Sequence, residues 1–262
     1  MVDLYLTMQD FFDMLNCQAN KRLLIKTQGA NRTVRGKALV IGNSDGIGLA
    51  TTKELLKQGW KVVGISRSDS PIQDPSYKHI VVEVQDAEYS GRLRSVLENH
   101  GPVDLCIFCA GIGEMLDLSN MQGEVKILEV NLIGMVKTAS CVIPLMVKRG
   151  KGHFIGISSV ADELLSAEAP SYHASKAGFS NYLEGLALAA RARGVHVSNV
   201  RFGFVDTKMA KGDVKPFMMG VERAAQHLLT CIEKKPVRYT APWFVIPLVK
   251  FRSLMLRLSI IL

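Results

Sequence analysis

Tyr172 and Lys176 stand four residues apart in the segment Tyr-His-Ala-Ser-Lys, and Ser159 precedes the tyrosine by thirteen residues. In a helix, residues i and i+4 share one face, so the Lys176 ammonium lies beside the Tyr172 hydroxyl and favours its phenolate. A free tyrosine titrates near pH ~10, and bringing it towards neutral pH needs roughly 3 to 4 kcal/mol from neighbouring cations. Such a trio can protonate a carbonyl oxygen while a hydride arrives from elsewhere. A surface Tyr/Lys pair has the same spacing, so the rest of the chain must decide.

The elements that would position this trio follow a regular pattern from Lys37 onward. Short apolar runs alternate with longer helical stretches, which is typical of βαβ units and a parallel sheet. Right-handed crossovers then predict a single α/β domain with a doubly wound parallel sheet of the Rossmann type, with its ligand outside the carboxyl ends of the strands. The predicted strands cover residues 37–41, 61–66, 79–84, 104–109, 152–158, 196–202 and 238–241, and the predicted helices cover 46–58, 89–99, 123–148, 171–193 and 221–234.

Size and composition indicate one globular domain. The chain has 262 residues, 48% hydrophobic and 21% charged, and no linker-like tract interrupts residues 36–242. The net charge of +8 permits attraction to phosphate groups or an anionic membrane. The basic residues are scattered, without a zinc-finger spacing or an aromatic-interleaved run, so we expect no nucleic-acid partner.

The cysteines and the start of the chain favour a cytoplasmic location. Five cysteines are present, and residues 1–9 lack the cationic region and apolar run of a signal peptide. Cys106 and Cys109 form a CxxC inside a predicted strand, where their side chains would face opposite ways. We therefore expect reduced thiols and no metal site.

A glycine-rich loop follows the first predicted strand and opens the first predicted helix. Glycines permit a tight turn, and the amide groups of a helix N-terminus offer donors and a positive dipole to a pyrophosphate. The spacing is GxxxGxG, and its strand-loop-helix context strengthens the signal. The loop therefore predicts a dinucleotide site with contacts from Gly42, Ser44, Asp45, Gly46, Ile47 and Gly48.

The end of the second predicted strand bears on the cofactor's adenosine ribose. An acidic residue there would bind the ribose hydroxyls of NAD, but this chain has Ser66 and Arg67. A guanidinium suits a 2′-phosphate, so NADP(H) is preferred over NAD(H). Asp45 adds negative charge nearby and tempers this preference, and Arg67 also fits an ordinary exposed loop.

In this order and spacing, the glycine loop, Asn131, Ser159, Tyr172 and Lys176 resemble the short-chain dehydrogenase/reductase family, from about residue 37 to residue 242. The resemblance implies that Ser159 hydrogen-bonds the substrate oxygen and that Tyr172 exchanges a proton with it. Lys176 would bind the nicotinamide ribose and lower the Tyr172 pKa. Asn131 would hold a water that links Lys176 to solvent.

The resemblance also implies the remaining cofactor contacts and the partners. Glu83 and Val84 should lie near the adenine, while Val205 and Thr207 should close over the carboxamide. The other implied cofactor residues are Ala110, Gly111, Tyr172 and Lys176. The substrate would be a small-molecule carbonyl or alcohol, and the assembly a homodimer or homotetramer.

Several positions depart from the family pattern. Phe108 and Cys109 replace two asparagines, and Phe202 replaces a proline. These changes keep open an alternative, a non-catalytic NADP(H)-binding sensor or scaffold protein of the same fold. Asp162 and Glu163, which follow the catalytic serine candidate, are expected to lie in a solvated loop.

The two ends of the chain lie outside the regular pattern. Residues 1–35 form an N-terminal extension, partly helical or disordered, and residues 243–262 form an apolar, basic C-terminal tail. The tail carries too many charges for a membrane span, and it fits an interfacial helix in peripheral contact with a membrane. It fits equally a segment that packs on the substrate mouth or at a dimer interface. An apolar mouth is expected from Leu164, Leu165, Met209, Phe217, Met218 and Met219, which favours an apolar substrate.

Overall fold

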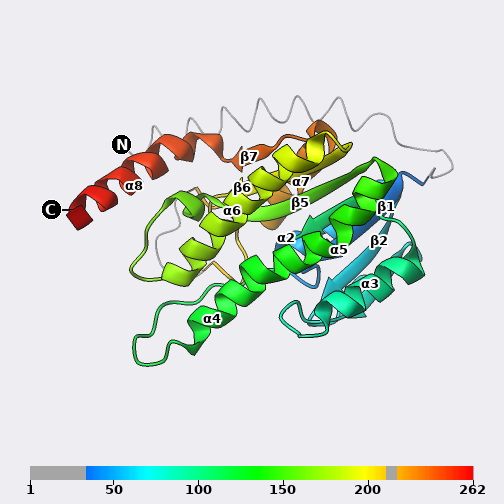
Figure 1. The fold of residues 1–262 in the computed structure, drawn as a ribbon, viewed down its shortest axis with the longest axis horizontal. Coiled ribbons are helices and arrows are strands. Elements are labelled where there is room, and N and C mark those ends of the chain that lie inside the picture. Colours follow the sequence, from blue (N-terminus) through cyan, green and yellow to red (C-terminus); the bar gives the residue numbers. More distant parts are fainter. Residues whose placement is uncertain (1–33, 211–216, 262) are drawn as a thin grey trace. The chain divides into compact units, whose positions relative to one another are not determined.

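The computed structural model describes residues 34–210 and 217–261, so the predictions for residues 1–33 lie outside the described residues. Seven strands form one parallel sheet in the order β3-β2-β1-β4-β5-β6-β7 (Figure 1). The strand order reverses direction between β1 and β4, so the predicted doubly wound sheet is confirmed. The strands are β1 (Gly36–Ile41), β2 (Trp60–Ser66), β3 (Tyr77–Val81), β4 (Leu105–Phe108), β5 (Gly152–Ser159), β6 (Val195–Phe202) and β7 (Arg238–Ala241).

Helices cover both faces of this sheet, because the central strands carry apolar side chains on both faces. Leu39 and Ile41 of β1 pack with α3, α5 and α6, whereas Ala38 and Val40 pack with α2 and α7. Both faces of the central strands are therefore buried, as a parallel sheet requires. The helices are α2 (Gly46–Lys57), α3 (Tyr89–His100), α4 (Gln122–Leu128), α5 (Gly134–Arg149), α6 (Pro170–Arg191), α7 (Val221–Lys234) and α8 (Ile246–Ile261), with short helical turns η2 (Glu129–Ile133), η3 (Val160–Glu163) and η4 (Trp243–Val245).

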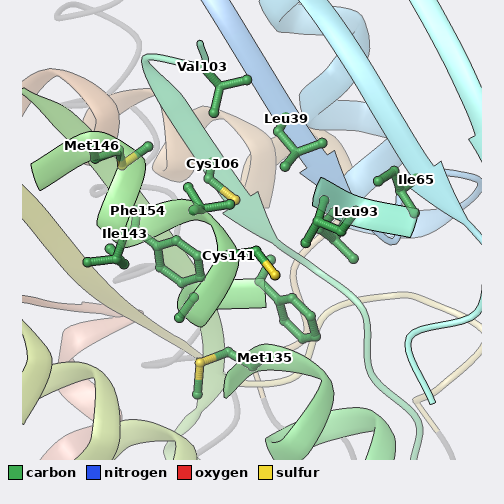
Figure 2. Packing of buried hydrophobic residues seen from close by; sticks show 14 of the residues in the cluster. Leu39, Ile65, Leu93, Val103, Cys106, Met135, Cys141, Ile143, Met146 and Phe154 are labelled. Atoms are coloured by element: carbon green, nitrogen blue, oxygen red, sulfur yellow. The ribbon is translucent and has the colours of Figure 1, made fainter. Parts of the chain in front are cut away.

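The larger core lies between the sheet and α5 (Figure 2). Cys106 and Phe154, from neighbouring strands, pack against Met135 and Met146 of α5, and all four side chains are fully buried. Each such side chain contributes roughly 1.5 to 3 kcal/mol through burial. This packing fixes the strand ends whose loops carry the candidate site.

Two predicted elements differ from the structure in ways that matter for the site. The third strand ends at Val81, so Glu83 and Val84 lie in the loop beyond it. The helix predicted over 123–148 contains a π-helical turn at Glu129–Ile133, with Asn131 at its centre. A π turn inside an α-helix has no signature in hydrophobic periodicity, and such turns frequently mark functional sites.

The combined helix Gln122–Arg149 is long and apolar enough to span a membrane, but half of its most apolar window is buried inside the protein. Its buried side chains, including Val142 and Met146, pack in the larger core. It is therefore explained as a core helix.

The C-terminal tail forms η4 and the helix α8. Val245 is buried, and Ser253 of α8 donates a hydrogen bond from its Oγ to the Glu163 carbonyl, at 2.5 Å. The tail therefore packs against η3, the turn that directly follows Ser159.

Candidate active site

The glycine loop connects β1 to α2 and packs closely on its surroundings. Gly42 has a φ of 82° and a Cβ there would lie 2.5 Å from the Ala110 backbone nitrogen. A Cβ on Gly48 would lie 2.1 Å from the Gly42 carbonyl oxygen. Gly46 has a φ of 54°, and a Cβ there would lie 3.3 Å from the Thr207 methyl group. These approaches leave no room for side chains, so the loop backbone lies against α2, β4 and the loop after β6.

Asp45 is the N-cap of α2, because its Oδ1 accepts a hydrogen bond from the Gly46 amide at 2.7 Å. Its Oδ2 lies 2.6 Å from the Lys208 ammonium. Hydrogen bonds from Lys208 and Gly46 hold the pKa of the Asp45 carboxyl below its usual value. The negative charge that Asp45 brings to the loop is thus partly balanced by Lys208.

A polar network lies beneath the predicted ribose loop. The Ser66 hydroxyl donates to the Ser68 carbonyl at 2.8 Å, and the same carbonyl lies 3.0 Å from His79 Nε2. His79 Nδ1 is 2.9 Å from the Tyr77 hydroxyl, which accepts a hydrogen bond from Asn43 Nδ2 at 2.6 Å. The network therefore ties the ribose loop to the glycine loop. Arg67 itself is exposed.

Sequence reasoning missed this network, because Tyr77 and His79 lie two residues apart on an edge strand and resemble ordinary strand residues. Gly64 makes room for it, since a Cβ there would lie 1.9 Å from the Asn43 amide nitrogen. Asn43 is fully buried and its Oδ1 has no hydrogen-bond partner. An unpaired buried acceptor in the loop is a feature that a ligand donor could satisfy.

The end of β5 and the start of α6 bring together Ser159, Tyr172 and Lys176. Tyr172 and Lys176 share one face of α6, and the Lys176 ammonium is 5.8 Å from the Tyr172 ring centroid. Lys176 Nζ donates to the Ile157 carbonyl at 3.0 Å. The Ser159 side chain lies close enough to the Tyr172 hydroxyl to influence its pKa. The three side chains thus form one cluster.

The direction of the Tyr172 pKa shift differs from the sequence-based expectation. The structure gives a pKa above the ordinary tyrosine value, because burial penalises the phenolate and Asp162 adds a negative charge. The Ser159 side chain acts in the opposite direction. Burial also lowers the pKa of Lys176 to about 8. In the protein alone, burial therefore outweighs the group that lowers the Tyr172 pKa, and the lowering by Lys176 stays a prediction.

Ser158 and Ser159 have different surroundings. Ser158 is buried and bonds to the Ser180 hydroxyl at 2.8 Å. Ser159 ends β5, where its Oγ lies 3.2 Å from the Phe202 carbonyl and accepts from the Ala161 amide. Its position beside Tyr172 supports the choice of Ser159.

Asn131 is fully buried in the π turn and bonds to both backbone groups of Ile112. Its Oδ1 accepts from the Ile112 amide at 2.8 Å, and its Nδ2 donates to the Ile112 carbonyl at 2.9 Å and to the Ser175 hydroxyl at 3.0 Å. Asn131 therefore fixes the segment after β4 against α6, immediately beside Lys176.

Asp162 and Glu163 do not lie in a solvated loop, so that prediction is wrong. The Asp162 side chain is 4% exposed and pairs with Arg201, which is 2% exposed. Arg201 also reaches Glu163, and Ser180 donates to Asp162 at 2.6 Å. The sequence offered no signal, because the partner lies 39 residues away on β6.

The other predicted cofactor residues line the same edge of the sheet. Ala110 and Gly111 follow β4 and lie against the glycine loop and Asn131, respectively. Val205 is buried and pairs with Met219, and Thr207 faces Gly46. Val84 is buried against Gly134. Glu83 is half-buried in the loop after β3.

The departures from the family pattern at Phe108 and Cys109 are explained by packing. Phe108 is fully buried, with its ring centroid 6.1 Å from that of Phe179. Cys106 and Cys109 pack in opposite core clusters, as predicted, and both are free thiols. Burial raises the pKa of Cys109 to about 12. These thiols are thus packing groups.

A dinucleotide fits the described residues, since the loop backbone, the α2 N-terminus and the unpaired Asn43 oxygen lie together at the carboxyl edge of the sheet. The fold and this loop define a nucleotide-binding oxidoreductase of the Rossmann class. The family model for short chain dehydrogenases matches residues 36–216. The chain belongs to the short-chain dehydrogenase/reductase family and is an NAD(P)-dependent enzyme acting on CH-OH and C=O groups.

Curated relatives agree with this assignment. A 3-oxoacyl-(acyl-carrier-protein) reductase of Vibrio cholerae is 32% identical over 183 residues, which cover 66% of this chain and 75% of the relative. An uncharacterized oxidoreductase of Myxococcus xanthus is 29% identical over 220 residues, covering 79% and 87%.

Solved structures match the fold. A short-chain dehydrogenase of Burkholderia cenocepacia, in complex with NADP, has a TM-score of 0.76 at 22% identity and covers 85% of this chain and 97% of its own. One from Streptomyces avermitilis has a TM-score of 0.74 at 22% identity, with coverage of 86% and 95%.

Proposed function

We propose that this enzyme is an NADP(H)-dependent carbonyl reductase or alcohol dehydrogenase acting on an apolar substrate. The observation that carries the proposal is the cluster of Ser159, Tyr172 and Lys176, in which the half-buried Ser159 and Tyr172 side chains interact beside a buried ammonium. The cofactor, when bound, supplies or accepts the hydride. The chain's own residues then have to orient the carbonyl carbon and handle one proton.

Tyr172 is the proton donor in reduction and the acceptor in oxidation. Ser159 holds the substrate oxygen beside the Tyr172 hydroxyl. Lys176, whose pKa is about 8, binds the nicotinamide ribose and supplies positive charge below that pH. Asn131, fixed to Ile112, keeps the backbone beside Lys176 in the geometry that a water link to solvent requires.

The preference for NADP(H) rests on Arg67, which follows β2 without a carboxylate at the strand end. The network beneath it holds the Ser66 and Ser68 groups in place. The loop can therefore receive a 2′-phosphate with little rearrangement.

The apolar substrate is supported by exposed apolar side chains on loops at the carboxyl edge of the sheet, where the cluster lies. Leu165, Phe204, Phe217 and Met218 are exposed on the loops that follow β5 and β6. Because one relative is named for the reduction of 3-oxoacyl thioesters, these compounds join simple ketones and aldehydes among the candidates.

We place the enzyme in the cytoplasm, in peripheral contact with a membrane, as a homodimer or homotetramer. Exposed apolar side chains along α5 and α6, including Leu145 and Leu188, support self-association. Light scattering behind a sizing column would give its mass, and a monomer at micromolar concentration would contradict the assembly.

The test measures NADPH and NADH oxidation with a panel of ketones, aldehydes and 3-oxoacyl thioesters. With the cognate carbonyl, Tyr172→Phe should lower kcat by about 10² to 10⁴ and leave the Kd for NADPH within about threefold. Substantial turnover by this variant would contradict the mechanism.

The alternative is an NADP(H)-binding sensor without turnover. It was motivated by Phe108, Cys109 and Phe202, whose packing in the core leaves the Tyr172 cluster intact. We therefore rank it second. Tight NADPH binding with no turnover across the whole panel would favour it.

A further inference from the structure

The helix α8 has two apolar faces, of which only one packs against the described part of the protein. The inner face carries Ser253, which is buried and bonds to the Glu163 carbonyl. Val249 and Leu256, one turn before and after it, are half-buried. This face holds the helix on η3, so the direction of the opposite face is fixed.

The opposite face is an exposed apolar stripe. At 3.6 residues per turn its members lie within a sector of about 120°, directed away from Ser253. Their side chains are between 43% and 62% exposed. We call this surface the outer face, and it consists of Leu248, Phe251, Leu254, Met255 and Leu258. Trp243, 63% exposed, lies at the start of the tail just before α8.

Cations border the outer face. Lys250 and Arg257 lie along one edge and Arg252 along the other, and all three are exposed. The sequence of α8 contains no acidic residue. A second copy of this face would bring the same cations together, whereas anionic headgroups would pair with them. The charge pattern therefore favours a lipid surface over a second copy.

We propose that the outer face of α8 binds an anionic bilayer, with the helix lying in the interfacial plane and its cations among the headgroups. This inference deepens the peripheral location given in the proposed function. The apolar side chains would enter the acyl boundary while Lys250, Arg252 and Arg257 extend to the phosphates.

The position of the tail gives this binding a consequence for the reaction. The Phe244 ring, in η4, lies 5.0 Å from the ring of Phe217, on the loop that leads to α7. Through η3 the same tail contacts the turn after Ser159. Binding through the outer face therefore holds the turn after Ser159 near the membrane, on the opposite side of α8.

The test uses the full chain and extruded vesicles of phosphatidylcholine with or without 30% phosphatidylglycerol, a proportion chosen on the order of that in anionic membranes. Sedimentation measures partitioning, and quenching by brominated lipid reports on tryptophan depth. The chain has two tryptophans, and Trp60 is buried in the core. Quenching should therefore come from Trp243, and Trp243→Phe should remove it.

Two variants separate the charge from the apolar contribution. Replacing Lys250, Arg252 and Arg257 by Gln should weaken binding to anionic vesicles on the order of a hundredfold, since each cation near such a surface contributes about fivefold. Replacing Phe251 and Leu254 by Ser should abolish quenching. The matched control replaces three exposed cations elsewhere, Lys61, Arg94 and Lys148, by Gln, which lowers the net charge equally and should bind as the wild type does.

Three outcomes would overturn the proposal. These are no partitioning of the full chain into anionic vesicles, equal partitioning of the α8 variants and the wild type, or an oligomer without lipid that the Phe251 and Leu254 changes dissociate. The last outcome would assign the outer face to a second copy. Because vesicle binding is measured without substrate, its result is independent of whether the proposed reduction is found.

Discussion

Arg201 forms a bidentate ion pair with Asp162 beside the candidate active site. Arg201 Nε lies 2.7 Å from Asp162 Oδ2, and Nη2 lies 2.6 Å from Oδ1. Asp162 raises the pKa of Tyr172 through its negative charge. Arg201 therefore does two things at once: it neutralises a buried carboxylate, and it limits the field that this carboxylate exerts on the tyrosine.

Arg201→Met should destabilise the protein by about 3 to 5 kcal/mol, because it leaves Asp162 buried without its cation. The double variant Arg201→Met/Asp162→Leu should recover part of this loss, because the buried Asp162 charge is removed together with its partner, while the more exposed Glu163 still loses its ion pair. Urea unfolding of the wild type, both single variants and the double variant gives the coupling energy. Additive losses would show that the pair acts independently.

Lys176 should make stability depend on pH in a specific window. Its folded pKa of about 8 is below the ordinary lysine value of 10.5. Below pH 8 both states hold the proton and the cost of burying the charge is complete. Between pH 8 and 10.5 the unfolded state binds more protons, so stability from this residue rises with pH.

Lys176→Met should therefore be more stable than the wild type at pH 7, by an amount that shrinks by about 3 kcal/mol towards pH 10.5. Urea unfolding of both proteins at pH 7, 8.5 and 10 measures this difference. Because the wild type and the variant share Tyr172, its own titration largely cancels. A difference that is constant with pH would contradict the prediction.

Much of the fold was predictable because its signals are local. Short apolar runs such as that in 36–41, and the helical stretches between them, define βαβ units without knowledge of any contact. The apolar residues around Glu83 predict a strand that continues to Val84, but β3 ends at Val81. Boundaries of this kind depend on hydrogen bonding to β2, which the sequence does not display.

The parts of the site that depend on distant partners were not predictable. The pairing of Asp162 with Arg201 requires β5 and β6 to be neighbours in the observed register, in which Ser159 is opposite Phe202. Asn131, in the π turn, makes two hydrogen bonds to Ile112, which lies 19 residues earlier in the chain. The YxxxK spacing, by contrast, is local to one helix, so its geometry followed from the sequence.

The network beneath Arg67 should determine how well the enzyme separates NADPH from NADH. Arg67→Gln should weaken NADPH binding about 10- to 100-fold, which corresponds to one charge-assisted hydrogen bond, and should change NADH binding little. Fluorescence titration with both nucleotides measures the ratio. Lys61→Gln, at an exposed position near the other end of β2, is the matched control. Equal losses for both nucleotides would remove Arg67 from the 2′-phosphate site.

Tyr77→Phe should weaken the binding of both NADPH and NADH. It removes the hydroxyl that accepts a hydrogen bond from Asn43, and so leaves a buried amide without a partner. We expect a loss of about 5- to 50-fold that does not favour either nucleotide. His79→Leu should act mainly on NADPH, because its Nε2 contacts the Ser68 carbonyl in the ribose loop. The same titrations measure the NADPH and NADH affinities of both variants. If both variants lost the same affinity for each nucleotide, His79 would have no separate effect on the ribose loop.

Gly48 should be required for NADPH binding because a side chain does not fit there, and Gly91, also in a helix, provides the control. A Cβ on Gly48 would lie 2.1 Å from the Gly42 carbonyl oxygen, a backbone atom, so the loop itself must move. Gly48→Ala should therefore weaken NADPH binding by at least about 100-fold, since the loop amides can no longer converge on a pyrophosphate.

The control is Gly91→Ala in α3, where a Cβ meets nothing within 4 Å. This variant should bind NADPH normally and gain up to about 1 kcal/mol of stability from the higher helix propensity of alanine. Thermal melts and nucleotide titrations of both variants measure the two effects, and normal NADPH binding by folded Gly48→Ala would show that the loop tolerates a backbone shift and that the close packing at this glycine is unrelated to the cofactor.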